Sequence, residues 1–372
     1  MRAIHRKLFR DLWEIKGQVL AIAAVIAVGI GMFLGYLSTF SSLKGTQEAY
    51  YDRYRFGEVF ASLKRAPRAL ESRIRDIPGV AAAETRVVAD VTLDVQGVDE
   101  PVTGRLISVP SDRRPALNDL ALLSGRYLEV GRADEVVVTE GFAEAHGLLP
   151  GDEVAAVING RRRELEVVGI ALSPEFVYTI RPGDMMPDAA RYGIFWMGEK
   201  ALATAFDMEG GFNDLSLRLM PGASEAEVIA RLDQLLEPYG GLGASSRDVQ
   251  VSNWYLNNEL NQLQGFGLMV PSVFLAVAAF LLNVVLTRII SIQREQIAAL
   301  KALGYSNGEV GTHYALWSLI IAACGGVAGL ALGRFLGRGM LSLYNDYFRF
   351  PFMEYRMAPE IIVAAVFITL VA

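Results

Sequence analysis

Cysteine and histidine are scarce in this chain of 372 residues, which contains one cysteine and three histidines. Cys324 lies inside an apolar run and has no second cysteine in the chain to pair with, so a folded domain here must be held together by packing alone. His5, His146 and His313 lie far apart in sequence and have no metal-ligand spacing such as H-x-x-x-H. We therefore expect structural or solvated histidines and no metal site.

Several functional motifs are also missing. The dipeptide Gly-Lys is absent, so the phosphate-binding motif G-x-x-x-x-G-K-[ST] cannot occur. A formal net charge of -6 indicates no general basic surface for nucleic acid. The long apolar runs carry no ladder of ionisable residues, which argues against a proton- or ion-coupled carrier. The sequence predicts a non-catalytic chain without cofactor or nucleic-acid partner, and any ATP must be hydrolysed by another protein.

Hydrophobic residues, in contrast, make up 52% of the chain and charged residues 20%, which favours a membrane protein with a soluble part. The uncharged stretch from Val19 to Leu37 can cross a hydrocarbon core of about 30 Å. A cleaved signal peptide is the alternative, but this apolar region exceeds the usual length of roughly 7 to 15 residues and no convincing small-x-small cleavage site follows it. Basic residues before it place the N-terminus in the cytoplasm.

Hydropathy predicts three spans and the start of a fourth. The predicted segments are a cytoplasmic basic N-terminus (1–16), a first span (17–40), an extracytoplasmic domain (41–264), a second span (265–287), a cytoplasmic coupling segment (288–313), a third span (314–337), an outer loop (338–358) and the start of a truncated fourth span (359–372). The last run is too short to span, so either the chain is a fragment or this run lies at an interface; we favour a fragment. The arginines at 334, 338, 349 and 356 oppose an outer loop by the positive-inside rule, but the first span usually dominates orientation.

The outer domain contains two predicted strand–helix–strand units. The first comprises Gly57–Leu63, Pro67–Asp76 and Val87–Val95. The second comprises a strand at Asp214–Met220, a helix to Leu236 that starts at a Ser224–Glu227 capping box, and a short strand at Asp248–Ser252. We expect these units to form one βαβ-type lobe.

The segment inserted between these units, residues 101–211, reads as mostly strands. We expect a strand at Glu135–Thr139, a helix at Glu140–His146 that ends at Gly147, and a hairpin through Asn159-Gly160 that joins 154–158 to 161–170. The predicted fold is therefore an α-helical membrane protein with an inserted α+β extracytoplasmic domain, in which a smaller β-rich lobe interrupts the βαβ-type lobe. The turns at 173–175 and 181–184 either line a ligand cleft or are plain loops, and we favour plain loops.

Residues 288–310, RIISIQREQIAALKALGYSNGEV, form a charged amphipathic segment between two apolar runs. Gly304 suits a left-handed position after a helix, and Ser306 with Glu309 makes a capping box for the next helix. The third span has one glycine per turn at Gly325, Gly329, Gly333 and Gly337, which favours close helix packing. Asn283 in the second span is interpreted as an interhelical hydrogen-bonding residue rather than a functional polar site.

The stretch from Arg294-Glu295 through Ile297 to Leu300-Lys301-Ala302-Leu303-Gly304, placed between two spans, resembles the coupling segment of FtsX-like and MacB-like permeases of ABC transporters. The outer domain, most closely at 135–169, resembles the periplasmic domain of MacB-type permeases. The resemblance implies that Arg294, Glu295, Ile297, Leu300, Lys301, Leu303 and Gly304 contact a separate ABC ATPase.

The resemblance also implies a bacterial inner-membrane location, a multi-pass chain and a second permease copy or a fused second half. A periplasmic adaptor or lipoprotein is a further expected partner. The expected function is to couple ATP hydrolysis on another chain to movement of the outer domain, which exports or extracts a lipid, lipoprotein, peptide or drug. The alternative is an FtsX-type regulator of cell-wall enzymes that transports nothing.

Overall fold

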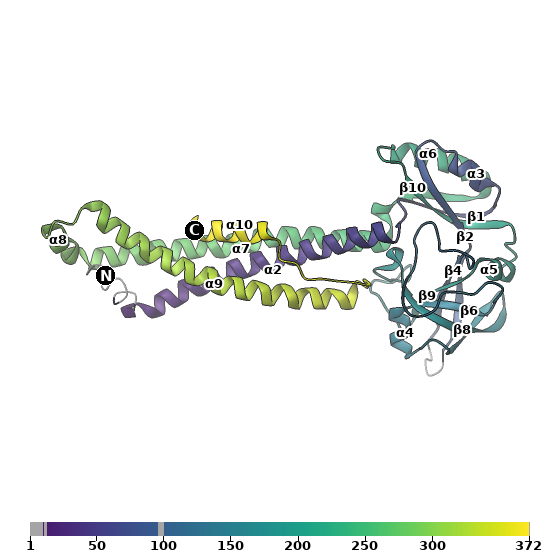
Figure 1. The fold of residues 1–372 in the computed structure, drawn as a ribbon, viewed down its shortest axis with the longest axis horizontal. Coiled ribbons are helices and arrows are strands. Elements are labelled where there is room, and N and C mark those ends of the chain that lie inside the picture. The colour runs from purple at the N-terminus through teal and green to yellow at the C-terminus, as the bar shows by residue number, and fades with distance from the viewer. Residues whose placement is uncertain (1–9, 11–12, 96–99, 372) are drawn as a thin grey trace. The chain divides into compact units, whose positions relative to one another are not determined.

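A computed structural model describes residues 10, 13–95 and 100–371, and the chain divides into two compact units (Figure 1). Unit 1 takes its described residues from 1–45, 259–345 and 353–372, and unit 2 comprises 46–258 and 346–352. Most of the predicted basic N-terminus (1–16), with His5, lies outside the described residues.

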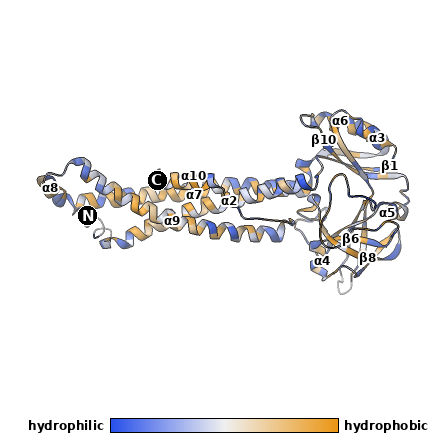
Figure 2. Ribbon diagram, in the orientation of Figure 1, coloured by the Kyte–Doolittle hydropathy of each residue, from blue (hydrophilic) through white to orange (hydrophobic). Residues whose placement is uncertain are grey.

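Unit 1 is built from helices. They are α2 (Lys16–Arg53), α7 (Val251–Ile292), α8 (Arg294–Ala302), α9 (Asn307–Tyr347) and α10 (Pro359–Val371). Helices α2, α7 and α9 are long and apolar enough to cross a membrane, and Figure 2 shows their hydrophobic stretches. Side chains from these helices, including Ile30, Leu34 and Trp317, form one buried apolar core. Helices α2 and α7 also contribute residues to unit 2.

One lobe of unit 2 is a four-stranded antiparallel sheet with two helices. Its strand order is β11 (Gly241–Ser246), β1 (Val59–Pro67), β10 (Gly211–Leu219) and β2 (Val80–Arg86). Helices α3 (Leu70–Arg75) and α6 (Glu225–Leu236) contribute Ile74, Val228 and Leu232 to its core. The chain order β1-α3-β2 and β10-α6-β11 makes this lobe a split βαβ arrangement.

The other lobe is a seven-stranded sheet. Its order is β5 (Ala121–Gly125), β8 (Arg161–Leu172), β6 (Glu135–Thr139), β9 (Tyr192–Gly198), β4 (Val102–Val109), β3 (Val88–Asp94) and β7 (Glu153–Ile158), with helices α4 (Glu140–His146) and α5 (Glu199–Ala205). Strand β7 also pairs with β8, so the sheet closes on itself and encloses an apolar core.

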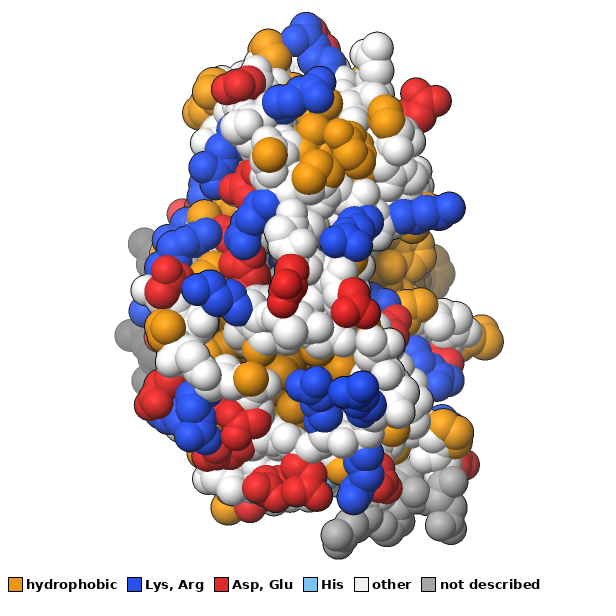
Figure 3. Space-filling model, turned by 90° about the vertical axis from the view of Figure 1, so that its right-hand side faces the viewer, with side chains coloured by type: hydrophobic (Ala, Val, Ile, Leu, Met, Phe, Trp, Pro, Cys, Tyr) orange, Lys and Arg blue, Asp and Glu red, His pale blue; other side chains and the backbone are white. Residues whose placement is uncertain are grey.

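One face of the molecule, seen in Figure 3, mixes positive, negative and hydrophobic side chains, as a solvated surface does.

Several local predictions are confirmed. Strand β6 and helix α4 have the predicted bounds, and Gly147 ends α4 with a left-handed φ of 64°. Asn159 and Gly160, with φ of 47° and 74°, form the turn that joins β7 to β8. Ser224 caps α6 by accepting a hydrogen bond from the Glu227 amide.

The predicted size of the inserted lobe is wrong, because the inserted sheet has seven strands and the other sheet four. Strand β3 belongs to the insertion, and the second strand of the first unit is the alanine-rich β2. The strand predicted at Asp248–Ser252 is also wrong: that stretch holds a 3₁₀ turn, Arg247–Val249, and the start of α7. The actual edge strand, β11, has the sequence GLGASS, whose small residues carry little strand signal.

Candidate functional site

The segment between α7 and α9 folds as a short helix with well-defined ends. Gln293 precedes α8, and Gly304 follows it with a left-handed φ of +95°. The Ser306 amide donates to Glu309 Oε2 at 2.9 Å, and the Glu309 amide donates to Ser306 Oγ at 3.2 Å. This reciprocal pair is the predicted capping box, and it starts α9 immediately after the turn.

Helix α8 carries no buried residue. The side chains of Arg294, Glu295 and Lys301 are exposed, as is Gly304. Leu303 is 78% exposed, although a leucine side chain gains free energy from burial. Ile297 and Leu300 are half-buried, and Ile297 packs against the apolar core of unit 1. The predicted coupling residues thus form a surface of charged and apolar side chains that no described part of the chain covers.

One hydrogen bond links the start of α8 to α9. The Tyr314 hydroxyl donates to Gln293 Oε1 at 2.8 Å, and the Tyr314 side chain is buried in the core of unit 1. Tyr305, in the turn after α8, packs on the same core. These contacts fix the direction in which α8 leaves α7.

Three glycines of α9 lie against α2. A Cβ added at Gly325 would lie 2.7 Å from Ile26 Cβ, and one at Gly329 would lie 2.7 Å from Ile30 Cβ. At Gly333 the added Cβ would lie 2.5 Å from Leu34 Cβ and 3.0 Å from the Gly31 carbonyl oxygen. Real Cβ atoms do not approach other atoms this closely, so the two helix backbones can meet here only because the side chains are absent.

Gly337 has a different neighbour from the other three glycines. A Cβ added there would lie 2.7 Å from Tyr355 Cε2, in the segment before α10. Thr39 of α2 donates to the Gly35 carbonyl at 2.8 Å and to the Gly337 carbonyl at 3.3 Å. The α2–α9 contact therefore ends in a polar link between the two helices.

Within unit 2, polar side chains connect α2 to α7. Gln47 Nε2 donates to Asn257 Oδ1 at 2.9 Å and to Asn253 Oδ1 at 3.3 Å. The Tyr51 hydroxyl donates to the same Asn253 oxygen at 3.0 Å. Buried amide and hydroxyl groups that bond to one another restrict how the two helices can slide.

The loop after α9 also belongs to unit 2. Arg349 Nη1 lies 3.3 Å from Glu140 Oε2 and 2.7 Å from Glu144 Oε2, both on α4. The Arg349 amide donates to the Val177 carbonyl at 2.9 Å. Burial raises the pKa of Glu140, and the charge of Arg349 opposes that rise. The charge of Arg349 is therefore balanced within unit 2 by the carboxylates of α4.

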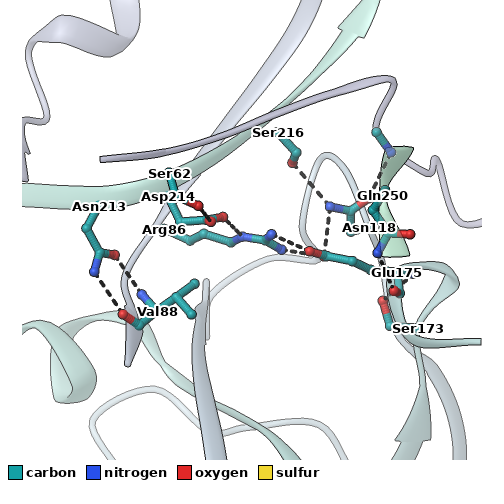
Figure 4. Close-up of polar contacts among 11 residues, drawn as sticks. Ser62, Arg86, Val88, Asn118, Ser173, Glu175, Asn213, Asp214, Ser216 and Gln250 are labelled. Atoms are coloured by element: carbon teal, nitrogen blue, oxygen red, sulfur yellow. Dashed lines mark hydrogen bonds and ion pairs between the residues drawn. The ribbon is translucent and has the colours of Figure 1, made fainter. Parts of the chain in front are cut away.

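A buried ion cluster links the four-stranded sheet to the 3₁₀ turn at Pro174–Phe176, which follows β8 (Figure 4). Arg86, the last residue of β2, donates through Nη1 and Nη2 to both Glu175 oxygens at 2.6 Å and through Nε to Asp214 Oδ1 at 2.6 Å. Asn118 Nδ2 also donates to Glu175, at 3.1 Å. Burial lowers the pKa of Arg86, but the two carboxylates more than offset this and raise it; burial also raises the pKa of Asp214.

Sequence reasoning missed this cluster. Arg86, Glu175 and Asp214 are far apart in the chain, and no spacing rule connects them. The available signal was that Arg86 and Asp214 fall on strands of one sheet, where a buried charge requires a partner.

Asn283, interpreted as an interhelical hydrogen-bonding residue, is exposed on α7 and bonds to none of the described residues. Across the residues the structure describes, no three metal-ligating side chains gather.

Comparison with known proteins matches residues 268–372 to the FtsX-like permease C-terminal family. No curated protein matches the chain. Among solved structures, the extracellular domain of the noncanonic ABC-type transporter YknZ from Gram-positive bacteria is similar, with 14% identity, a TM-score of 0.32, and coverage of 51% of this chain and 98% of that one. The periplasmic region of MacB from Actinobacillus actinomycetemcomitans shows 11% identity and a TM-score of 0.34, with coverage of 55% and 92%. A domain of a permease-type protein from Porphyromonas gingivalis shows 12% identity and a TM-score of 0.32, with coverage of 52% of this chain and 90% of that one.

Proposed function

We propose that this chain is an FtsX-like permease, the membrane subunit of a bacterial ABC transporter, and passes ATP-driven motion from α8 to unit 2. A separate ATPase would bind α8, and movement of α8 would shift α7 and α9. The observation that carries the proposal is the surface of α8, where Leu303 is 78% exposed beside charged side chains between two apolar helices. Exposed apolar side chains rimmed by polar ones mark protein-binding sites.

The length and hydropathy of α7 and α9, each able to cross a membrane once, support the proposed membrane topology. Residues 251–258 of α7 and 346–347 of α9 are counted in unit 2, whereas α8 is part of unit 1. Two apolar helices that each cross once, one leaving unit 2 and one returning to it, would place α8 on the opposite face. A cytoplasmic α8 then requires unit 2 to be extracytoplasmic.

Close helix contacts support the transmission step. Movement of α9 cannot leave α2 behind easily, because the glycine contacts bring the two backbones together and leave no flexible side chain between them. In unit 2, the Gln47–Asn257 and Tyr51–Asn253 hydrogen bonds connect α2 to α7. Displacement of α7 would therefore also displace α2, and displacement of α2 would displace α7.

A second permease copy, or a fused second half, is the proposed membrane partner. Helix α7 exposes large apolar side chains such as Val273, Phe280 and Val284, and Asn283 lies exposed beside them. An amide in the hydrocarbon layer is costly unless another protein group accepts its hydrogen bonds. The substrate proposed from the family resemblance is a lipid, lipoprotein, peptide or drug at the outer face, with an adaptor or lipoprotein as a further partner.

The test is Leu303→Asp in the full chain, with Leu149→Asp as a matched control. Leu149 is 66% exposed in unit 2, so the same change there leaves α8 intact. Both variants should insert and fold like the wild type. Leu303→Asp should weaken binding of the ABC ATPase that co-purifies with the wild-type chain by more than about tenfold, because it places a charge in an apolar contact. Unchanged ATPase binding and stimulation in lipid nanodiscs would refute the proposal.

A further inference from the structure

A cavity of about 390 Å³ lies inside unit 2, next to the Arg86 cluster. Its wall includes Arg105 of the seven-stranded sheet, Asp214 of the four-stranded sheet and Tyr255 in the first turns of α7. This volume falls in the range of roughly 300 to 1,000 Å³ that is usual for small-molecule sites. The turns at 173–175 and 181–184, expected to be plain loops, both line this cavity with charged side chains.

Three arginines in the wall have N–H groups that donate to none of the described residues. Arg86 uses three of its five N–H groups on Glu175 and Asp214. Arg105 bonds to Asp90 through Nε and Nη2, at 2.8 and 2.9 Å, and its Nη1 bonds to no described residue. Arg181 bonds to Asp184 in the same way, and again Nη1 has no acceptor in the described chain.

The carboxylates in the same wall, in contrast, are already occupied. Both Glu175 oxygens accept from Arg86, and Asp214 accepts from Arg86 and from the Ser62 hydroxyl. Both Asp184 oxygens accept from Arg181. The charges of the three arginines balance those of these three carboxylates, so the wall is close to neutral but offers mainly donors. Hydrogen bonding, rather than net charge, would select the ligand.

Aromatic rings form the remaining wall. Tyr178 and Tyr255 stack with their centroids 4.5 Å apart and an interplanar angle of 29°. Phe176 and Tyr192 line the cavity as well. Flat rings of this kind favour an aromatic or apolar ligand body.

We propose that this cavity binds a small molecule that carries an anionic acceptor group, a phosphate or a carboxylate, on an aromatic or apolar body. The anionic group accepts from the Nη1 groups of Arg105 and Arg181, and the body lies against the Tyr178–Tyr255 pair. Because Arg105 lies on β4 and Tyr255 on α7, the ligand contacts the seven-stranded sheet and α7 at once. This inference does not depend on the ATPase, since binding is measured on the chain alone.

The test is calorimetric titration of the full chain in nanodiscs with phenyl phosphate, and with phenol as the neutral match. Phenyl phosphate should bind at least about tenfold more tightly than phenol, because only the phosphate accepts charge-assisted hydrogen bonds. Arg105→Gln and Arg181→Gln should each weaken phenyl phosphate binding by about tenfold and leave phenol binding unchanged. Arg162→Gln is the matched control, because Arg162 lies in the same sheet, is exposed and does not line this cavity.

A soluble short-chain phosphatidic acid, the dihexanoyl form, distinguishes the source of the anion. Tighter binding of this lipid than of phenyl phosphate supports a lipid headgroup, and the reverse supports a soluble aromatic anion. The unfolding midpoint of each variant should stay at the wild-type value, because Arg105 and Arg181 are partly exposed and ion pairs of this kind add little stability. Equal affinity for phenol and phenyl phosphate, or no effect of either arginine variant, would overturn the proposal.

Discussion

The contact between α9 and α2 allows a quantitative test by glycine-to-alanine substitution. At Gly333 the alanine Cβ would lie 2.5 Å from Leu34 Cβ and 3.0 Å from the Gly31 carbonyl oxygen. Leu34 is fully buried and Gly31 presents backbone, so neither can move aside without separating the helices. Overpacking of this kind costs about 1–3 kcal/mol, which corresponds to roughly a five- to 150-fold change in the unfolding equilibrium constant.

The same helix supplies the controls. An alanine Cβ at Gly311 or Gly339 would meet nothing within 4 Å. Alanine has the higher helix propensity, by about 1 kcal/mol in water, so these two variants should be neutral or slightly stabilising. The gain in helix propensity is common to both variants and cancels, so Gly333→Ala should be less stable than Gly339→Ala by the overpacking cost alone, about 1–3 kcal/mol.

The assay is denaturant unfolding of the full chain in detergent micelles, monitored by intrinsic fluorescence. Gly325→Ala and Gly329→Ala should also be destabilised, since each added Cβ would lie 2.7 Å from an isoleucine Cβ. If all variants unfold within about 0.5 kcal/mol of one another, as surface substitutions do, α9 does not pack on α2 in this way.

Two further predictions concern a hydrogen bond of α8 and an ion pair of unit 2. Tyr314→Phe removes the hydrogen bond to Gln293 and should lower stimulation of the partner ATPase severalfold, while membrane insertion is unchanged. Tyr347→Phe, at an exposed position, is the control. Equal stimulation by both variants would contradict the role of Tyr314. Hydrogen bonds from Arg126 lower the pKa of Glu135, so Glu135 contributes stability above its unfolded pKa of about 4.3 and loses it as the pH falls through the folded pKa. Glu135→Gln should therefore reduce the unfolding midpoint more at pH 7 than at pH 3.5, and a pH-independent difference would refute this.

Local sequence determined the elements whose signals span only a few residues. The Asn159-Gly160 turn requires two positive φ angles, and few residue pairs other than Asn-Gly adopt them readily. Helix α4 and its glycine end were predictable for the same reason. The alanine-rich β2 and glycine-rich β11 carry no such signal, because their strand conformation comes from pairing with neighbours distant in sequence.

The candidate site likewise combines features that local sequence predicts with contacts that only the tertiary structure shows. The sequence by itself determined the apolar helices, the amphipathic segment before Gly304 and the glycine repeat of α9, because hydropathy and helical periodicity are properties of neighbouring residues. Only the tertiary structure decided that Gly325, Gly329 and Gly333 face α2, that Arg349 pairs with α4, and that Arg86, Glu175 and Asp214 meet beside a cavity. Those contacts join residues separated by tens to hundreds of positions, so they depend on how the chain closes and packs rather than on any local pattern.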